Sequence, residues 1–189
     1  MLHQPSPEAR TLGADLRALR RARQLTLQDL ASSLGRSVGW LSQVERDLSE
    51  PSITDLRRMA RLFDVSVSSL FRVQAAPGEE GHIVRRDARR PIGSRSEGLI
   101  ETLLSPDLTD DFEVVHSTFA PGAAISDPVT RPTQEVGYIV RGQLDLWIDG
   151  QLFHLAAGDS FRVRGEPYRW SNPHDTPCEA IWVISPPVY

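Results

Sequence analysis

The sequence has no lysine, a single cysteine and no long apolar stretch. All 21 basic residues are therefore arginine, which fits a G/C-rich genome. The lone Cys178 excludes an intramolecular disulfide and a cysteine-rich zinc site. Because no run of about 18 apolar residues occurs, we expect no membrane span. Residues 1–10 lack the apolar core of a signal peptide, so we expect a cytoplasmic protein.

Charge is divided unevenly along the 189 residues, although the whole chain carries only −4. Residues 8–72 hold eleven Arg against eight Asp and Glu, a net +3, while residues 73–189 hold ten against seventeen, a net −7. The basic part is the one suited to a nucleic acid, and the acidic remainder would be repelled by it. A chain of this length accommodates one large domain or two small ones. We therefore expect the two parts to have different tasks.

Residues 26–51 have the pattern of two short helices joined by a tight corner. Thr26 and Ser37 can each cap a helix start with a hydroxyl oxygen, and Asp29 follows Thr26 three residues later. Gly35 falls between the helices, where a left-handed conformation costs glycine nothing. The apolar positions recur at helical spacing and can share one core: Leu27, Leu30, Ala31, Leu34, Leu41 and Val44.

The second of these helices leaves an outward face made of Val38, Gly39, Trp40, Ser42, Gln43 and Arg46. Here residues 12–71 resemble the helix-turn-helix of phage-repressor-like (XRE-type) transcription regulators. The resemblance is carried by Leu30-Ala31, Gly35, Ser37, Leu41-Ser42, Glu45 and Glu50-Pro51-Ser52-Ile53. It implies binding to double-stranded DNA through Thr26, Gln28, Ser37, Val38, Gly39, Trp40, Ser42, Gln43 and Arg46.

Within that set the residue types predict different roles. Gln43 is expected to read a base, because a glutamine amide pairs well with adenine in the major groove. Phosphate contacts, which position the protein without specifying sequence, are expected from Thr26, Gln28, Ser37 and Ser42. Trp40 either lies against the sugar–phosphate backbone or folds back onto the helices. Arg20 and Glu45 resemble an ion pair that braces the recognition helix of phage repressors.

Five helices are expected in a bundle that spans residues 10–72. Besides the two above, one covers residues 12–23 and a short one covers residues 66–71. The remaining helix follows Ser52 and directs these residues to the core: Ile53, Leu56, Met59, Ala60 and Phe63. Residues 1–9 are predicted to be a disordered tail. Residues 73–84, rich in Gln, Ala, Pro, Gly and Glu, are predicted to be a linker to a domain at residues 85–189.

After the linker the helical spacing disappears and short apolar or alternating runs replace it. They cover residues 99–104, 113–119, 135–140, 143–148, 151–155, 160–163 and 179–184, separated by turn residues. Many short strands with regular turn signals are typical of an all-β sandwich or barrel. The predicted fold class is an α+β two-domain chain, with an N-terminal five-helix all-α helix-turn-helix bundle and a C-terminal all-β domain.

Residues 85–187 resemble the cupins, a family of small jelly-roll barrels. Gly122, Glu135 and Gly142 match the first cupin motif, and Gly150, Gly158-Asp159, Pro167 and Asn172 match the second. In metal-bearing cupins three histidines and the glutamate bind the ion. Here the histidine positions hold Pro128, Thr130 and Tyr168, and only Glu135 is kept. Because a transition-metal site needs three or four N, O or S ligands, we predict no metal and no other cofactor.

The ligand-binding residues predicted for the cupin domain are Thr130, Arg131, Glu135, Tyr168 and Trp170. A carboxylate beside an indole and a phenol can hold an ammonium or guanidinium group by ion pairing and cation–π attraction. Arg131 can equally hold a carboxylate, so the expected ligand is an amine, an amino acid or a dipeptide. The alternatives are a structural role for Glu135 and a core role for Tyr168 and Trp170.

Together these features predict a sequence-specific DNA-binding transcriptional regulator, a repressor, whose cupin domain binds a small-molecule effector without a metal. One helix-turn-helix reads only a few base pairs, so we expect a homodimer on a palindromic operator. No catalytic residue is predicted. Two alternatives stay open: a metal-dependent cupin enzyme with an attached DNA-binding head, and a DNA binder whose cupin domain only dimerises.

Overall fold

The structure is a computed structural model that describes residues 11–63, 65, 67–70, 78, 79, 81–92, 96–106, 108 and 110–188. The chain separates into two compact units, one mainly helical and one built from strands. The tail predicted for residues 1–9 lies outside the described residues, and the linker predicted for residues 73–84 lies partly outside them. The domain boundaries therefore stay predictions.

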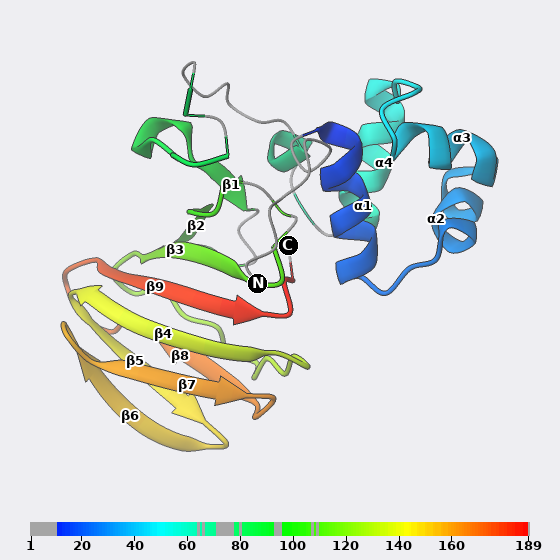
Figure 1. The fold of residues 1–189 in the computed structure, drawn as a ribbon. Coiled ribbons are helices and arrows are strands. Elements are labelled where there is room, and N and C mark those ends of the chain that lie inside the picture. The colour runs from blue at the N-terminus through cyan, green and yellow to red at the C-terminus, as the bar shows by residue number, and fades with distance from the viewer. Residues whose placement is uncertain are drawn as a thin grey trace, which may run out of the picture. The chain divides into compact units, whose positions relative to one another are not determined.

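The helical unit contains α1 (Leu12–Ala22), α2 (Leu27–Leu34), α3 (Val38–Val44) and α4 (Ile53–Phe63), which Figure 1 labels. Thr26 caps α2 through a reciprocal box, because its hydroxyl accepts from the Asp29 N–H at 3.1 Å and the Asp29 carboxylate accepts from the Thr26 N–H at 2.9 Å. Ser37 caps α3 by accepting from the Trp40 N–H. Gly35 ends α2 in the left-handed conformation, with φ of 66°. The predicted caps are confirmed.

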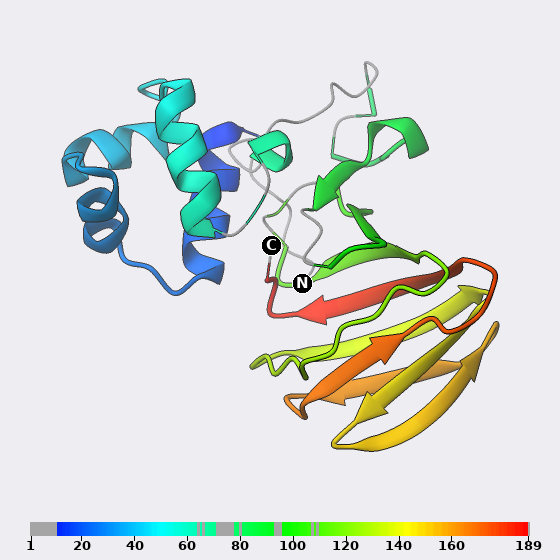
Figure 2. The ribbon, with the colours of Figure 1, turned by 180° about the vertical axis from the view of Figure 1, so that it is seen from behind.

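The helical core is formed by one face of each helix. Its buried apolar side chains are Leu16, Leu19, Leu30, Ala31, Leu34, Leu41, Val44, Leu56, Met59, Ala60 and Phe63. Of the six core positions predicted between residues 26 and 51, only Leu27 is half-buried rather than buried. In Figure 2 the same helices are seen from behind. No helix in the described segments combines the length and the apolar character needed to cross a membrane.

Two expectations for the helical unit were wrong. Val67–Leu70 forms a four-residue 3-10 helix (η2) instead of a fifth α-helix, so the described part of this unit has four α-helices. Four residues form too few hydrogen bonds to offset the unfavourable free energy of starting an α-helix. Short segments of this kind commonly adopt 3-10 geometry instead. Ile53 is 51% exposed, because it is the first residue of α4 and the core is packed by the later turns.

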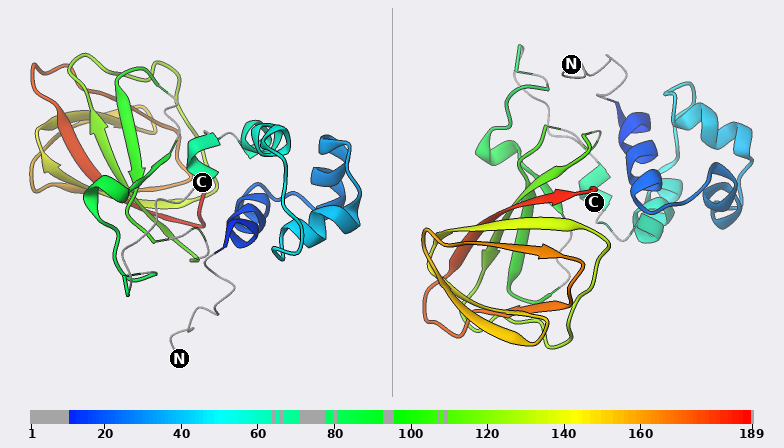
Figure 3. Two further views of the ribbon diagram at one scale, coloured as in Figure 1. Left: turned by 90° about the horizontal axis from the view of Figure 1, so that it is seen from above. Right: turned by 60° about the horizontal axis from the view of Figure 1, so that its bottom comes forward.

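The strand unit holds two sheets. Their strands are β1 (Arg90–Ile92), β2 (Leu99–Leu103), β3 (Glu113–Phe119), β4 (Gln134–Arg141), β5 (Gln143–Ile148), β6 (Gln151–Ala156), β7 (Ser160–Arg164), β8 (Tyr168–Ser171) and β9 (Cys178–Ser185). One sheet has the order β1-β2-β3-β9-β4-β7 and the other the order β6-β5-β8 (Figure 3). Strand pairing in the described residues therefore gives a domain of two sheets, and the predicted barrel is not shown closed.

All seven predicted strands are present, with ends that differ by at most one residue. The prediction missed β1 and β8, which have three and four residues and are too short for a clear alternation. Along β4 the alternation places Glu135, Gly137 and Ile139 inside. A Cβ on Gly137 would lie 2.1 Å from Cζ of Phe161, so this glycine is needed to let the Phe161 ring fill the interior.

Candidate DNA-binding surface and cupin cavity

Helix α3 presents one polar face to solvent. Gly39 and Gln43 are exposed and, four residues apart, lie on one side of α3, and Arg46, two residues past the end of the helix, is also exposed. Val38, Trp40 and Ser42 flank them and are half-buried. Because Leu41 and Val44 anchor the opposite side in the core, the predicted base-reading face is free to enter a groove.

The residues predicted to contact phosphate also stabilise the helix ends. The Thr26 hydroxyl donates to the Asp29 carboxylate at 2.5 Å. The Gln28 amide donates to the Ser32 hydroxyl at 3.1 Å, and Ser37 caps α3. Arg46 Nε donates to the Ser42 carbonyl at 3.0 Å, which folds the guanidinium back along the helix. Thr26, Gln28 and Ser37 are exposed, and their phosphate contacts stay predictions.

The predicted brace between Arg20 and Glu45 is confirmed. Arg20 Nε and Nη2 donate to the two Glu45 oxygens at 2.6 and 2.9 Å, and both side chains are buried. The hydrogen bond with Glu45 raises the pKa of Arg20 against the opposing effect of burial. A third bond joins Arg20 Nη1 to the Leu25 carbonyl at 2.8 Å. The C-terminal end of α3 is thereby fixed to α1.

A second cluster, which sequence reasoning missed, holds the other end of α3. The Arg36 guanidinium lies 5.0 Å from the Trp40 ring centre and donates to both oxygens of the buried Asp55, at 3.1 and 2.9 Å. Ser52 also donates to Asp55, at 2.6 Å. Burial alone would raise the pKa of Asp55, but the bonds from Arg36 and Ser52 outweigh it and lower the pKa. The Ser52-x-x-Asp55 capping pattern was the signal available in the sequence.

Trp40 falls between the two positions predicted for it. Its ring is half-buried and lies under Arg36, so it is partly folded back on the helices. Gln43, three residues further on, is its neighbour on the helix surface. Trp40 therefore lies between Arg36 and Gln43, the residue predicted to read a base.

The strand unit contains a cavity of about 90 Å³ between its sheets. Four of the five predicted ligand residues line it: Arg131, Glu135, Tyr168 and Trp170. Thr130 is exposed and does not line the cavity. The cavity is also lined by Glu101 and Trp182, which were not predicted as ligand residues. Trp182 was detectable, because it shares the inward register of Ala180 and Ile184 in a predicted strand.

Glu135 is surrounded by partners from its own chain. Its carboxylate accepts from the Thr133 hydroxyl at 2.7 Å and from the Tyr168 hydroxyl at 3.3 Å. Arg131 Nη1 lies 4.0 Å from the same carboxylate, and Glu135 is only 1% exposed. Glu135 is thus a buried carboxylate that holds Arg131 and Tyr168 in place at the cavity wall.

These residues do not fit the metal ion of the metal-bearing cupins. Glu135 is the one usual ligand among them, and the Arg131 cation lies where a metal ion would be repelled. Pro128 and Thr130 are exposed rather than gathered around Glu135. Within the described segments no group of three or more His, Cys, Asp or Glu side chains could hold a metal ion. We derive no chemistry through a metal.

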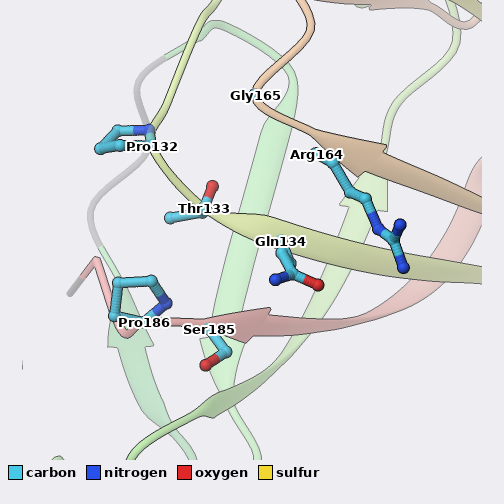
Figure 4. Close-up of a pocket in the computed structure, with 7 residues that line it drawn as sticks. All are labelled: Pro132, Thr133, Gln134, Arg164, Gly165, Ser185 and Pro186. Atoms are coloured by element: carbon cyan, nitrogen blue, oxygen red, sulfur yellow. The ribbon is translucent and has the colours of Figure 1, made fainter.

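A second hollow of about 460 Å³ opens at the surface of the same unit (Figure 4). It is lined by Pro132, Thr133, Gln134, Arg164, Gly165, Ser185 and Pro186. None of the predicted ligand residues is among these seven. Thr133 connects the hollow to the cavity, because its hydroxyl donates to Glu135. The cavity between the sheets, which has charged and aromatic walls and four of the five predicted ligand residues, is therefore the candidate ligand site.

Cys178 is fully buried at the start of β9. Burial, with a smaller effect of the neighbouring Glu179 charge, raises the pKa of its thiol to about 11. A thiol with so high a pKa is almost wholly protonated near neutral pH and reacts poorly. Cys178 therefore behaves as a small core residue, in line with the sequence-based interpretation of the lone cysteine.

Two domain families match the sequence: a helix-turn-helix domain over residues 11–70 and a cupin domain over residues 115–184. The chain is therefore a helix-turn-helix protein that also carries a cupin domain. It is homologous to the HTH-type transcriptional regulator PuuR of Escherichia coli (strain K12), with 26% identity over 188 residues, 97% of this chain and 100% of PuuR.

Two further relatives share part of this organisation. The HTH-type transcriptional regulator SutR of Escherichia coli (strain K12) is 29% identical over 160 residues, 84% of each chain. The immunity repressor protein of Bacillus phage phi105 is 28% identical over 97 residues, 51% of this chain and 67% of the phage protein.

Proposed function

We infer that this protein is a DNA-binding transcriptional regulator, a repressor, that recognises an operator through α3. The observation that carries this inference is the exposed side of α3, formed by Gly39 and Gln43 and followed by the exposed Arg46, opposite the buried Leu41 and Val44. In helix-turn-helix proteins the second helix of the motif lies in the major groove and contacts base edges. The homology to PuuR, SutR and a phage repressor supports the same function.

The proposed contacts divide by residue type. Gln43 reads a base, and Val38, Gly39 and Trp40 allow close or apolar approach to the DNA. Thr26, Gln28, Ser37, Ser42 and Arg46 contact phosphates and set the position of α3. All of these residues are exposed or half-buried. Since phosphate contacts release counterions, operator affinity should fall steeply as salt is raised.

The test is the affinity of Gln43→Ala for the operator, which is first selected from random duplex DNA with the native protein. We expect the loss of one bidentate base contact to cost about 1–3 kcal/mol at that operator, and to relax the preference at one base pair. Gln151→Ala, at an exposed position of β6, is the matched control. An unchanged affinity for Gln43→Ala would remove this residue from the recognition face.

We further propose that the cupin domain binds a small-molecule effector and has no catalytic activity. The cavity supports this, because it combines the charged groups Arg131 and Glu135 with the aromatic walls of Tyr168 and Trp170. An effector alters operator affinity only if it binds the two states of the protein unequally. The effector class is an amine, an amino acid or a dipeptide, and the site of action is the cytosol, where the operator lies.

Thermal unfolding in the presence of these three compound classes tests the effector. A rise in Tm with at least one class is expected, because a ligand that binds only the folded state stabilises it. A flat response with every class would favour a cupin domain that only dimerises. Metal analysis of the purified protein tests the enzyme alternative, and a stoichiometric iron, manganese or zinc signal would contradict the metal-free proposal.

A further inference from the structure

The Arg36 guanidinium is the exposed end of the ion pair with Asp55. Arg36 lies in the corner between α2 and α3, directly before Ser37, the residue that caps α3. Its side chain is 47% exposed, whereas the Asp55 side chain is 2% exposed. The pair therefore lies at the surface of the helical unit, with its anion buried and its cation accessible to a partner from outside the chain.

One edge of this guanidinium is left for such a partner. A guanidinium has N–H donors on two edges, and each edge can hold an anion through two parallel bonds. Asp55 accepts from the edge formed by Nε and Nη2, at 3.1 and 2.9 Å. Among the described residues no acceptor is bonded to Nη1. The edge formed by Nη1 and the second N–H of Nη2 can therefore bind a second anion.

Two contacts hold Arg36 before any ligand arrives. Besides the two bonds to Asp55, the guanidinium lies 5.0 Å from the centre of the Trp40 ring, within the range of cation–π attraction. Asp55 is itself held by the Ser52 hydroxyl, which donates to it at 2.6 Å. A long side chain loses much rotational freedom when it is ordered. Because Arg36 is already ordered, less freedom is left to lose when it binds an anion.

The position of Arg36 favours the DNA backbone over the bases. Base edges are read from the helix that enters the major groove, and Arg36 precedes Val38, the first residue of that helix. Its guanidinium is bonded to Asp55 in the first turn of α4, so it lies beside the reading helix. Phosphates line the rim of the groove, and arginine binds them through paired N–H···O bonds. A backbone phosphate is therefore the anion that fits.

We propose that Arg36 holds a phosphate of the operator, an inference that rests on the proposed DNA-binding function and adds a contact to it. The guanidinium bridges the buried Asp55 carboxylate and the phosphate. This contact fixes the N-terminal end of α3 on the DNA backbone, while Gln43 reads a base. It adds affinity for every sequence and gives no preference among sequences.

The salt dependence of DNA binding by Arg36→Met tests the contact. The probes are the operator duplex selected with the native protein and a duplex of scrambled sequence. For each Arg36 on the DNA, we expect Arg36→Met to bind both duplexes about tenfold more weakly. The slope of log K against log salt concentration should also fall in magnitude by about 0.9.

Arg61→Met is the matched control, because it removes the same charge from an exposed position in the last turn of α4. It should keep the slope of the native protein. Equal slopes for Arg36→Met and Arg61→Met would overturn the proposal. A loss confined to the operator duplex would contradict a phosphate contact, because phosphates carry no sequence information.

Asp55→Asn separates the phosphate contact from the structural role of the ion pair. This variant removes the charge that holds Arg36 but keeps the cation, so the salt slope should equal that of the native protein. Affinity should fall less than in Arg36→Met, because the guanidinium is only less well ordered. If Arg36 acted solely by tying the corner to α4, both variants would show the same loss of affinity and the same slope, and the proposal would be wrong.

A scan with neutral methylphosphonate at one operator phosphate after another identifies the partner. One substitution in each half-site should weaken binding of the native protein about tenfold and leave Arg36→Met almost unaffected, because that variant has already lost the contact. Each protein is compared with itself, so a folding defect does not produce this difference. Equal losses for both proteins at every phosphate would leave Arg36 without a phosphate partner. A native protein that prefers no selected duplex over random DNA would instead refute the proposed DNA-binding function.

Discussion

At the scale of single residues, Gly13 and Gly39 of the helical unit differ in whether the packing around them requires a glycine. A Cβ on Gly13 would lie 2.4 Å from the Val44 carbonyl oxygen, so the packing of the helices requires glycine there. A Cβ on Gly39 would meet nothing within 4 Å. Glycine inside a helix is less stable than alanine, and the fold gives no reason for it at Gly39. Close approach to DNA supplies that reason under the proposed function.

Gly39→Ala should therefore stabilise the protein and weaken its binding to DNA. We expect the free energy of unfolding to rise by about 0.5–1 kcal/mol, because alanine favours the helix and its Cβ projects into open space. Operator affinity should fall, because the added methyl group faces the groove.

Urea unfolding and operator titration measure the two effects separately. Gly13→Ala is the contrasting control and should destabilise the protein, because its Cβ would meet Val44 and the Asp47 carboxylate. If Gly39→Ala gained stability and kept full operator affinity, Gly39 would not approach the DNA.

At the scale of elements, α3 is held at both ends by ion pairs, one buried and one between the exposed Arg36 and the buried Asp55. Arg20–Glu45 joins its C-terminal end to α1, and Arg36–Asp55 joins the corner before it to the start of α4. A helix of seven residues has little stability of its own. The orientation of the recognition face is thus imposed by its neighbours in the helical unit.

Removal of one partner of the Arg20–Glu45 pair should be strongly destabilising. Glu45→Ala leaves the Arg20 charge buried without its counter-ion, which costs about 3–5 kcal/mol in pairs of this kind. The double variant Arg20→Met/Glu45→Leu should recover most of that stability. Denaturant unfolding gives both values, and a double variant as unstable as Glu45→Ala would show that the pair itself is needed.

Acid should weaken the ion pair between Asp55 of α4 and Arg36, which precedes α3, because Asp55 loses its charge when it is protonated. The folded-state pKa of Asp55 is lowered, so its contribution to stability is fully present above the unfolded pKa of about 4 and is lost as the pH falls through the lower folded value. Stability measured from pH 7 to pH 2 should fall less for Asp55→Asn than for the native protein. Parallel curves would indicate that Asp55 does not titrate in this window.

At the scale of the whole molecule, the six-stranded sheet has an exposed apolar outer face that suits a second copy of the chain. Val136 pairs with Val183 and Tyr138 with Ile181 across β4 and β9, in the centre of this sheet. Val136, Tyr138 and Val183 are 46%, 48% and 42% exposed. Since a palindromic operator needs two recognition helices, we propose this face as the homodimer contact.

Tyr138→Glu should convert the dimer to a monomer, because it places a charge in the centre of an apolar contact. Light scattering after size-exclusion chromatography measures the mass. The affinity for a palindromic operator should fall much more than the affinity for one half-site. Leu152→Glu, on the other sheet and 39% exposed, is the control. A Tyr138→Glu variant that is still dimeric would exclude this face.

Local sequence signals predicted the elements well. The capping residues Thr26 and Ser37 and the corner at Gly35 act within three or four positions of the chain, and alternation in β4 placed Glu135 inside. These local signals did not predict the elements correctly where an element was very short, as in Val67–Leu70 and β8. The residues on the exposed side of α3 could accordingly be identified almost completely from the sequence.

The lining of the cupin cavity could be predicted only in part, because tertiary contacts decide which residues reach the cavity. Tyr168 is 33 positions from Glu135 along the chain and donates to it across the sheets. Phe161 lies over Gly137 and packs against Trp182 of the cavity wall, and Thr130 is left outside. Sequence alone therefore determined the four α-helices and the longer strands, since these depend on neighbours a few residues apart. Only the packing of distant strands decided the size and the charged walls of the cavity.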